Sequence, residues 1–313
     1  MSRMYYNQMI GVYVKEVRLR TSSEGIPTLR RSLCCDGVIF DVMAGLGNQL
    51  FQYAAARATS LRLGCPLYLN IDWFDRYTDR ELALNAFKIV GTLFRGTKWE
   101  KFRDRNYPRL APRVEYLGND IDQRIFAAQP GMRFMGNWQS EVYFRAFTQQ
   151  IREEVSLSVP LSENSRRVID QIQSRSAVAV HVRRGDYIAD PATSKIYATC
   201  APDYYQRASA KLREMVSTDV TFFLFSDDID WATQNLKFLG NCIPVDCNGR
   251  NRPWEDLALM AACNHNIIPN STFSWWAAWL NPNPNKIVIS PAVWYIQPNM
   301  SNRNIVPNNF ITV

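Results

Sequence analysis

The second half of the chain alternates short apolar runs with amphipathic segments, and this rhythm constrains the fold more than any other feature. We expect strands at 177–183, 220–225, 243–246, 266–269 and 286–290. We expect helices between them at 203–216, 228–238, 253–263 and 271–280. Strands that alternate with helices build a parallel sheet with helices on both faces. The rhythm therefore predicts a doubly wound α/β domain.

The first half of the chain begins in the same way. It predicts a strand at 38–43, a helix at 48–63 stopped by Gly64, and a strand at 66–71. The periodicity of 75–130 is poor and predicts no element, whereas the polar stretch 159–164 is typical of a linker. We therefore expect a basic N-terminal extension (1–36) and two Rossmann-like domains (37–160 and 161–313) that face each other across a cleft. Ligands bind such sheets outside the carboxyl ends of their strands.

The net charge of +7 favours an anionic partner such as a nucleotide sugar or a lipid headgroup. We expect no nucleic acid partner, because the sequence contains no known nucleic-acid-binding pattern. The first 35 residues hold six Lys/Arg against two acidic residues. This excess predicts either a solvated arm or peripheral contact with an anionic membrane.

The sequence also indicates a cellular compartment. It has seven cysteines but no CxxC pair, so we expect reduced thiols and no zinc site. No apolar run is long enough to span a bilayer, and the first residues do not read as a signal peptide. These features predict a cytoplasmic protein.

The first chemical motif, GLGNQL, follows the predicted strand 38–43 and opens a helix. Gly45 and Gly47 let the backbone approach a ligand closely, and a helix start favours negative charge. Leu50 stands where a dinucleotide-binding motif has its third glycine, so NAD binding is disfavoured. A tight turn with Asn48 as the helix N-cap is the alternative.

The second motif is HVRRGD, at the end of the predicted strand 177–183. Strand alternation places His181 and Arg183 on one face and Arg184 on the other. Guanidinium groups bind diphosphate oxygens in bidentate fashion, and Asp186 can hold one arginine in place. A purely structural Arg–Asp pair is the alternative.

Three further motifs remain open at this stage. Ser226 and Asp227 precede Asp228 and Asp230, and this run predicts either a helix cap, a nucleotide contact or a metal site. Asn270–Ser274 supplies hydroxyl groups and free N–H groups at a helix start, which suits an anion or an ordinary cap. Asn137–Glu141 is compatible with sugar binding, and Trp275, Trp276 and Trp279 are expected to pack in the core.

In combination and in this order, the motifs resemble the α-1,2-fucosyltransferase family. The segments that carry the resemblance are GLGNQLFQYAAARA (45–58), NWQSEVYF (137–144), HVRRGDYI (181–188), FSDDIDW (225–231) and HNIIPNSTFSWWAAWL (265–280). The resemblance covers about 38–294. It implies a two-domain GT-B fold, inverting transfer from GDP-β-L-fucose to the 2-hydroxyl of galactose in a glycan or lipid-linked acceptor, and no cofactor or essential metal. It also implies a bacterial enzyme, located at or near the inner face of the cytoplasmic membrane.

The resemblance also assigns roles to individual residues. Arg183 and Arg184 would serve the diphosphate and Asp186 would orient them. The sequence does not identify a catalytic base: Asp186, Glu141 and His181 are the candidates, and a strongly dissociative transition state would need none. The residues that would bind the donor nucleotide are Gly47, Asn48, His181, Arg183, Ser226, Asp227, Asp256, Asn270, Ser271, Thr272, Phe273 and Ser274.

Overall fold

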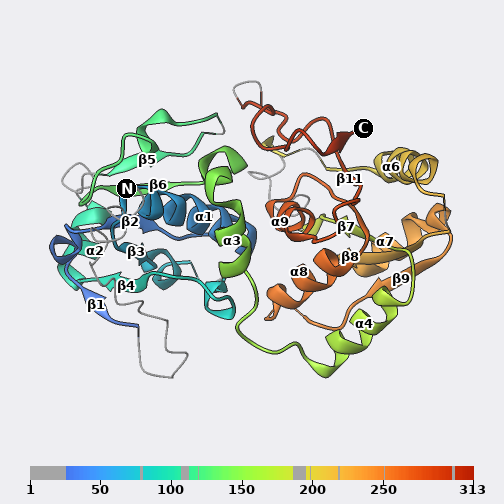
Figure 1. The fold of residues 1–313 in the computed structure, drawn as a ribbon, viewed down its shortest axis with the longest axis horizontal. Coiled ribbons are helices and arrows are strands. Elements are labelled where there is room, and N and C mark those ends of the chain that lie inside the picture. Colours follow the sequence, from blue (N-terminus) through green and yellow to red (C-terminus); the bar gives the residue numbers. More distant parts are fainter. Residues whose placement is uncertain are drawn as a thin grey trace, which may run out of the picture.

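The computed structural model describes residues 26–77, 80–106, 113–118, 120–185, 195–197, 199–217, 219–249, 251–297 and 300–313. Two lobes lie side by side, and each is built on a six-stranded parallel sheet (Figure 1). Among the described residues, no helix has the length and apolar character needed to cross a membrane.

The first sheet has the strand order β1-β4-β3-β2-β6-β5. Its strands are β1 (Thr28–Leu29), β2 (Val38–Asp41), β3 (Leu67–Asn70), β4 (Thr92–Gly96), β5 (Val114–Tyr116) and β6 (Arg133–Gly136). The predicted strands 38–43 and 66–71 are confirmed as β2 and β3, whereas the poorly periodic region also contributes β4 and β5. Helix α1 (Leu46–Leu63) covers one face and ends at Gly64, whose φ of 63° suits glycine. Helix α2 (Lys98–Asn106) lies on the outer side of this lobe.

The second sheet has the order β12-β11-β10-β7-β8-β9. Its strands are β7 (Ala177–Val182), β8 (Thr221–Ser226), β9 (Cys242–Val245), β10 (His265–Ile267), β11 (Val288–Ser290) and β12 (Ile311–Thr312). The helices are α4 (Glu163–Gln173), α6 (Pro202–Met215), α7 (Ile229–Asn235), α8 (Pro253–Ala262) and α9 (Thr272–Leu280). All predicted elements of this half are present. The helix predicted to run to Phe238 is shorter, because α7 ends at Asn235 and a 3-10 turn follows.

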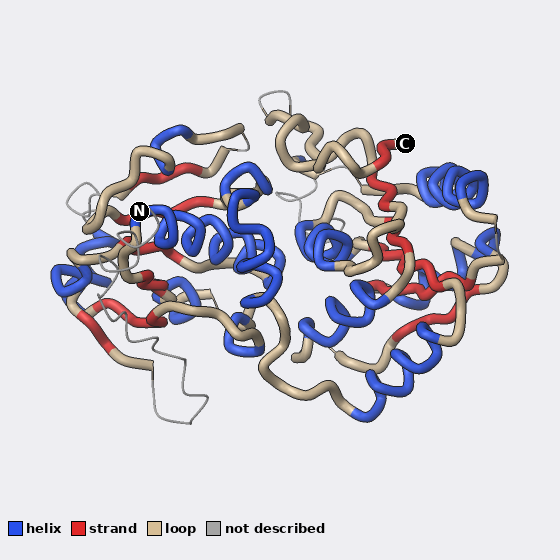
Figure 2. Tube along the Cα trace, in the orientation of Figure 1, coloured by secondary structure: helices blue, strands red, loops and turns tan. Residues whose placement is uncertain are grey.

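Strand β7 shows why this half of the sequence is readable. Ala177 and Ala179 pack into the core that includes α8 and α9, while Val178 and Val180 pack into a second core with α6. A strand buried on both faces appears in sequence as a continuous apolar run. Figure 2 shows the helices on both sides of this sheet.

The two lobes meet through aromatic side chains of α1 and α9. The ring centroid of Phe51 lies 4.5 Å from that of Trp275 and 5.1 Å from that of Trp276. Phe144 stacks on Trp276 at 5.5 Å. The expected packing role of the tryptophans is confirmed. Helix α3 (Thr148–Glu154) lies between the lobes, just before the chain crosses to α4.

The described part of the predicted N-terminal extension is docked onto the first sheet. β1 pairs with β4, and the buried side chain of Arg31 makes ion pairs of 2.6 Å with Asp72 and 2.8 Å with Asp104. The expectation of a solvated arm is therefore wrong for residues 26–35, because Arg31 supplies the counterion for buried carboxylates. Residues 1–25 lie outside the described part of the chain.

Candidate active site

The loop after β7 is organised by Asp227, which follows the neighbouring strand β8. One carboxylate oxygen of Asp227 lies 2.9 Å from Nη1 of Arg183 and also accepts a hydrogen bond from the Gly185 N–H. The other oxygen accepts from the Arg184 N–H at 2.9 Å. A Cβ at position 185 would lie 2.9 Å from this carboxylate, which explains the glycine. Asp227 therefore positions the Arg183 loop.

Arg184 points to the opposite side of the sheet, as strand alternation predicted. Its guanidinium carbon lies 3.5 Å from the ring centroid of Trp231 on α7, and its Nε lies 3.5 Å from Asp228. Trp231 and Asp228 therefore hold Arg184 at α7. Arg183, by contrast, is about 25% exposed at the strand end.

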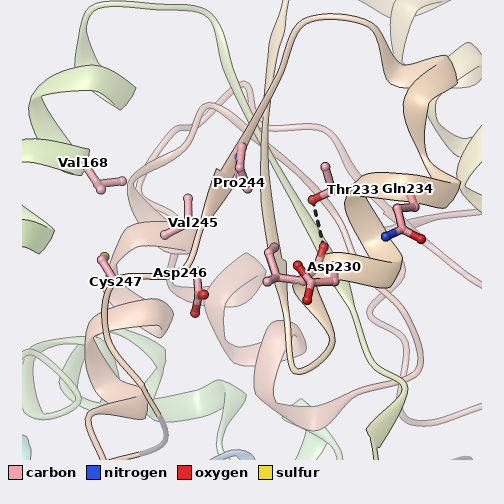
Figure 3. Close-up of a pocket in the computed structure, with 9 residues that line it drawn as sticks. Val168, Asp230, Thr233, Gln234, Pro244, Val245, Asp246 and Cys247 are labelled. Carbon is pink, nitrogen blue, oxygen red and sulfur yellow. Dashed lines mark hydrogen bonds between the residues drawn. The ribbon is translucent and has the colours of Figure 1, made fainter.

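The run Ser226–Asp230 acts as a helix cap. The Asp228 carboxylate accepts a hydrogen bond from the Trp231 N–H, and the Ser226 hydroxyl accepts one from the Asp228 N–H. Asp230 points elsewhere. It lines a cavity of about 570 Å³ beside Asp246 at the β9 edge (Figure 3). The capping interpretation is confirmed, and the described residues contain no cluster of three or more His, Cys, Asp or Glu side chains that could hold a metal.

His181 lies on the α9 face of the sheet, where its ring contacts Phe273 at a centroid distance of 5.8 Å. The side chain is buried, and its Nδ1 has no hydrogen-bond partner among the described residues. Burial lowers the pKa of His181 to about 4; Asp227 opposes this shift and Arg183 reinforces it. The imidazole is therefore neutral near pH 7.

The start of α9 combines structural residues with free donors. Asn270 is buried, and its amide donates to the Trp294 carbonyl at 2.8 Å. The Ser274 hydroxyl is also buried and donates to the Ser271 carbonyl. Ser271 is the N-cap, but its side chain makes no capping hydrogen bond. The first N–H groups of an α-helix have no intrahelical acceptor, so those of Thr272 and Phe273 can bind an anion.

Gly47 brings the start of α1 against the start of α9. A Cβ at this position would lie 2.5 Å from the Phe273 nitrogen and 2.5 Å from the Thr272 carbonyl carbon. The sequence predicted close approach of a ligand, but the group that approaches Gly47 is the backbone of the other lobe. This contact holds two helix starts together, and their N-terminal partial charges reinforce each other.

Asn48 is the third residue of α1, and the N-cap is Gly45, so the N-cap interpretation of Asn48 is wrong. The Oδ1 atom of Asn48 instead accepts a hydrogen bond from Gln139 at 2.8 Å. Gln139 in turn accepts a hydrogen bond from the hydroxyl of Tyr295 in the second lobe at 2.7 Å. This chain of three side chains fixes the Asn48 amide so that its NH2 group is available for a ligand.

Strained backbone conformations occur close to Asn48 and Gln139 in the sequence. Ala44 and Trp138 have φ angles of 64° and 52°, a left-handed conformation that is costly for side chains other than glycine. Ala44 precedes the turn into α1, and Trp138 precedes Gln139. Sequence reasoning missed Tyr295 as a site residue because it lies far along the chain in an irregular segment. Gln139 belonged to a recognised motif but was not assigned a role.

Asp256 lies in the first turn of α8 and is held by a polar network. Its Oδ1 accepts a hydrogen bond from the Asn248 amide at 2.7 Å, and Asn248 accepts one from the Ser165 hydroxyl at 2.7 Å. Burial raises the pKa of Asp256 to about 6; the Asn248 hydrogen bond opposes this shift, and the charges of Asp246 and Glu255 add to it. Asp256 therefore titrates close to physiological pH.

Of the candidates Glu141 and Asp186 for the catalytic base, only Glu141 lies among the described residues. Glu141 begins a 3-10 turn on the first lobe and is half-buried. Asp186 lies outside the described residues. The predicted arginine-holding role therefore stays a prediction for Asp186, while Asp227 provides that support among the described residues.

The carboxyl edge of the second sheet thus carries Arg183 after β7, the start of α9 after β10 and the half-buried Asp256 after β9, and these groups suit a nucleotide diphosphate. Comparison with known proteins places the chain in the glycosyltransferase class. The family described as Glycosyl transferase family 11 matches residues 112–312, more than half of the chain. The chain belongs to this family, and the resemblance to α-1,2-fucosyltransferases drawn from the motifs is confirmed.

Curated relatives include bacterial and animal enzymes. The chain is 28% identical over 287 residues to an α-1,2-colitosyltransferase of Escherichia coli, covering 88% of this chain and 98% of the relative. It is 31% identical over 289 residues to the O-antigen biosynthesis glycosyltransferase WbnK of Escherichia coli, covering 82% and 94%. It is 30% identical over 159 residues to human galactoside α-(1,2)-fucosyltransferase 1, covering 48% and 43%.

Solved structures support the fold. A mutant of Arabidopsis thaliana FUT1 in complex with GDP matches with a TM-score of 0.52 at 10% identity, covering 87% of this chain and 75% of that one. The NodZ α-1,6-fucosyltransferase soaked with GDP-fucose matches with a TM-score of 0.50 at 16% identity, covering 82% and 96%. These likenesses support the arrangement of two parallel-sheet α/β lobes.

Proposed function

We propose that this glycosyltransferase transfers L-fucose from GDP-β-L-fucose to the 2-hydroxyl of galactose in a glycan or lipid-linked acceptor. The two lobes would act as a GT-B pair, with the donor bound to the second lobe and the acceptor approaching from the first. The reaction inverts the anomeric carbon and forms an α-1,2 linkage without an essential metal.

The observation that carries this proposal is the position of Arg183 and of the start of α9 after the carboxyl ends of the neighbouring strands β7 and β10, with the start of α1 packed against the start of α9. Arg183 is partly exposed at the carboxyl end of β7, and Gly47 brings the two helix starts into contact. A guanidinium and unpaired backbone N–H groups are suitable ligands for a diphosphate. The leaving GDP would gain negative charge at this point as the glycosidic bond breaks.

The acceptor hydroxyl would attack the anomeric carbon from the side opposite to GDP. The bond from that carbon to the phosphate oxygen breaks with its electron pair, and the acceptor proton leaves to a base. The low pKa of His181 disfavours it as that base. Glu141 and Asp186 remain the candidates. Preorganised donors aimed at the leaving charge would supply stabilisation that a metal provides in other enzymes.

Asp256 and His181 would recognise guanine. The half-buried carboxylate of Asp256, fixed by Asn248, can accept hydrogen bonds from adjacent N–H groups of the base. Removing such a partner leaves a buried polar group unpaired, which penalises a base that lacks these donors. This arrangement supports GDP over a uridine or adenosine diphosphate.

A second candidate donor is GDP-colitose, favoured by the similarity to the α-1,2-colitosyltransferase over nearly the full length of that relative. Colitose is L-fucose without the 3-hydroxyl. The two donors therefore differ by one hydroxyl group, and a site built to hydrogen-bond that hydroxyl rejects the analogue lacking it.

The test is to incubate the protein and EDTA with GDP-fucose or GDP-colitose and a panel of β-galactosides. The product linkage would be determined by NMR. We expect acceptor-dependent GDP release with fucose on galactose O2. A higher kcat/KM with GDP-colitose than with GDP-fucose would assign GDP-colitose as the donor. Turnover only after Mn²⁺ is restored would contradict metal independence.

A further inference from the structure

Helix α2 has an unusual division of its side chains. Its two acidic residues face inward: Glu100 accepts hydrogen bonds from the Arg31 and Thr97 N–H groups, and Asp104 pairs with Arg31 and Arg133. Both carboxylates are therefore engaged in contacts within the protein. The outward side of the helix is left without an acidic side chain of its own.

The outward side of α2 carries aromatic residues instead. Trp99 is 65% exposed and Phe102 is 56% exposed, and they lie three residues apart on one helical face. In the 3-10 turn Arg31–Cys34, whose Arg31 N–H donates to Glu100 of α2, Leu33 is also 66% exposed. Large exposed apolar side chains that gather in one place mark an interaction site.

Cations surround these apolar side chains. Lys98 and Arg105 of α2 are exposed, and the Arg103 guanidinium lies 5.3 Å from the ring centroid of Trp99. Interfacial helices combine a Trp/Phe/Leu surface with Lys and Arg, because aromatic rings enter the headgroup region while cations attract anionic lipids. This patch, formed by Trp99, Phe102, Lys98, Arg103 and Arg105 of α2, has that composition, and Arg103 also pairs with Asp104 at 3.1 Å.

The position of the patch suits such a contact. Figure 1 places α2 at the end of the first lobe that is farthest from the second lobe. A surface bound there leaves the junction of α1 and α9 uncovered. We propose that this α2 patch binds the surface of an anionic lipid bilayer peripherally. The occupant is a lipid surface because cations border the aromatic side chains and the acids of the helix are turned inward.

The experiment is sedimentation of the full chain with vesicles of phosphatidylcholine alone or with about 30% phosphatidylglycerol, which supplies the anionic surface; both preparations are extruded to the same size. We expect binding to the anionic vesicles and at least a fivefold weaker association with neutral ones, since each cation near the surface contributes about a fivefold change. Raising the salt concentration should weaken binding, because it screens the charges.

Two variants locate the contact. The double variant Trp99→Ser/Phe102→Ser changes two exposed residues and should reduce vesicle binding by about tenfold or more. Its turnover with a soluble acceptor should stay unchanged. Lys98→Ser/Arg105→Ser should reduce binding to anionic vesicles only. The matched control is Met215→Ser/Phe238→Ser, which removes two exposed apolar side chains of the second lobe and should bind as wild type.

Quenching of tryptophan fluorescence by brominated lipids gives a second readout, because Trp99 is far more exposed than buried tryptophans such as Trp275 and Trp276. Loss of quenching on Trp99→Phe is the expected result. Equal binding of wild type and the Trp99/Phe102 variant would overturn the proposal. So would sedimentation analysis showing that the patch instead joins two copies of the chain, with vesicle binding unaffected by its loss.

Discussion

In each lobe, an arginine on or just after one strand pairs with an aspartate on or just after the neighbouring strand, yet the two arginines differ in exposure. In the first lobe, the side chain of Arg133 is 8% exposed and pairs with Asp41 at 2.8 Å and Asp104 at 2.9 Å. In the second lobe, Arg183 is 25% exposed beside Asp227, which is itself partly exposed. The same residue types therefore build the interior in one lobe and the proposed ligand site in the other, and exposure distinguishes the two arginines.

The largest expected effect is on stability, from breaking the first-lobe network. Arg133→Met would leave Asp41 and Asp104 buried without this counterion. Breaking a buried ion pair in this way costs about 3–5 kcal/mol of unfolding free energy. Urea unfolding would measure the loss. Arg124→Met is the control, because the Arg124 side chain is 57% exposed and solvent screens its pair with Asp122, so the loss of unfolding free energy should be much smaller.

The matching change in the second lobe should affect chemistry and spare the fold. Arg183→Lys keeps the charge but loses the planar fork. We expect kcat to fall by about 10²–10³, the usual loss for one preorganised donor, with little change in melting temperature. Arg207→Lys, at an exposed pair with Asp203, is the control and should keep wild-type kcat. If Arg183→Lys lost as much unfolding free energy as Arg133→Met, the distinction between a structural arginine in the first lobe and a ligand-binding arginine in the second would be contradicted.

The pH dependence of donor binding tests whether the carboxylate of Asp256 contacts the donor. The pKa of Asp256 is raised to about 6, and the ionised form is the one that accepts hydrogen bonds from guanine. The KM for the donor should therefore be flat above about pH 7 and rise as pH falls through 6, approaching tenfold per pH unit. Asp256→Asn should have a higher KM without this dependence. An unchanged profile in that variant would remove Asp256 from base recognition.

The smallest expected effect comes from the hydrogen-bond chain that crosses between the lobes. Tyr295→Phe removes the donor to Gln139 and loosens the Asn48 amide. A net hydrogen bond contributes about 0.5–1.5 kcal/mol, so kcat/KM should fall about two- to tenfold. Tyr68→Phe, which removes a hydrogen bond to exposed Asp36, is the control. Equal losses in both variants would indicate that the chain has no special role in positioning Asn48.

The sequence predicted the second lobe well, because its strands are continuous apolar runs and its motifs follow directly at their ends. The turn after β7 and the start of α9 are local features, so Arg183, Ser271 and Thr272 could be found from neighbouring residues alone. The partner of Arg183 is less local. Asp227 follows the next strand, and only the pairing of β7 with β8 reveals its role.

The first lobe could not be read in the same way. Its strands β4, β5 and β6 are only three to five residues long, and some of the side chains buried in this lobe are polar or charged. Arg133 and Asp41 are 92 positions apart, and no local pattern predicts that such charges neutralise each other inside a protein. The Asn48–Gln139–Tyr295 chain has the same character, because it joins segments 91 and 156 positions apart.

Calorimetric titration of GDP into wild type and Arg183→Lys tests the central claim most directly, with guanosine as the ligand that lacks the diphosphate. Hydrogen bonds to charged groups contribute about 1.5–3 kcal/mol, so the variant should bind GDP about 10- to 100-fold more weakly and guanosine as well as wild type does. Equal GDP affinity in the two proteins would contradict the account, because Arg183 would then be as structural as Arg133.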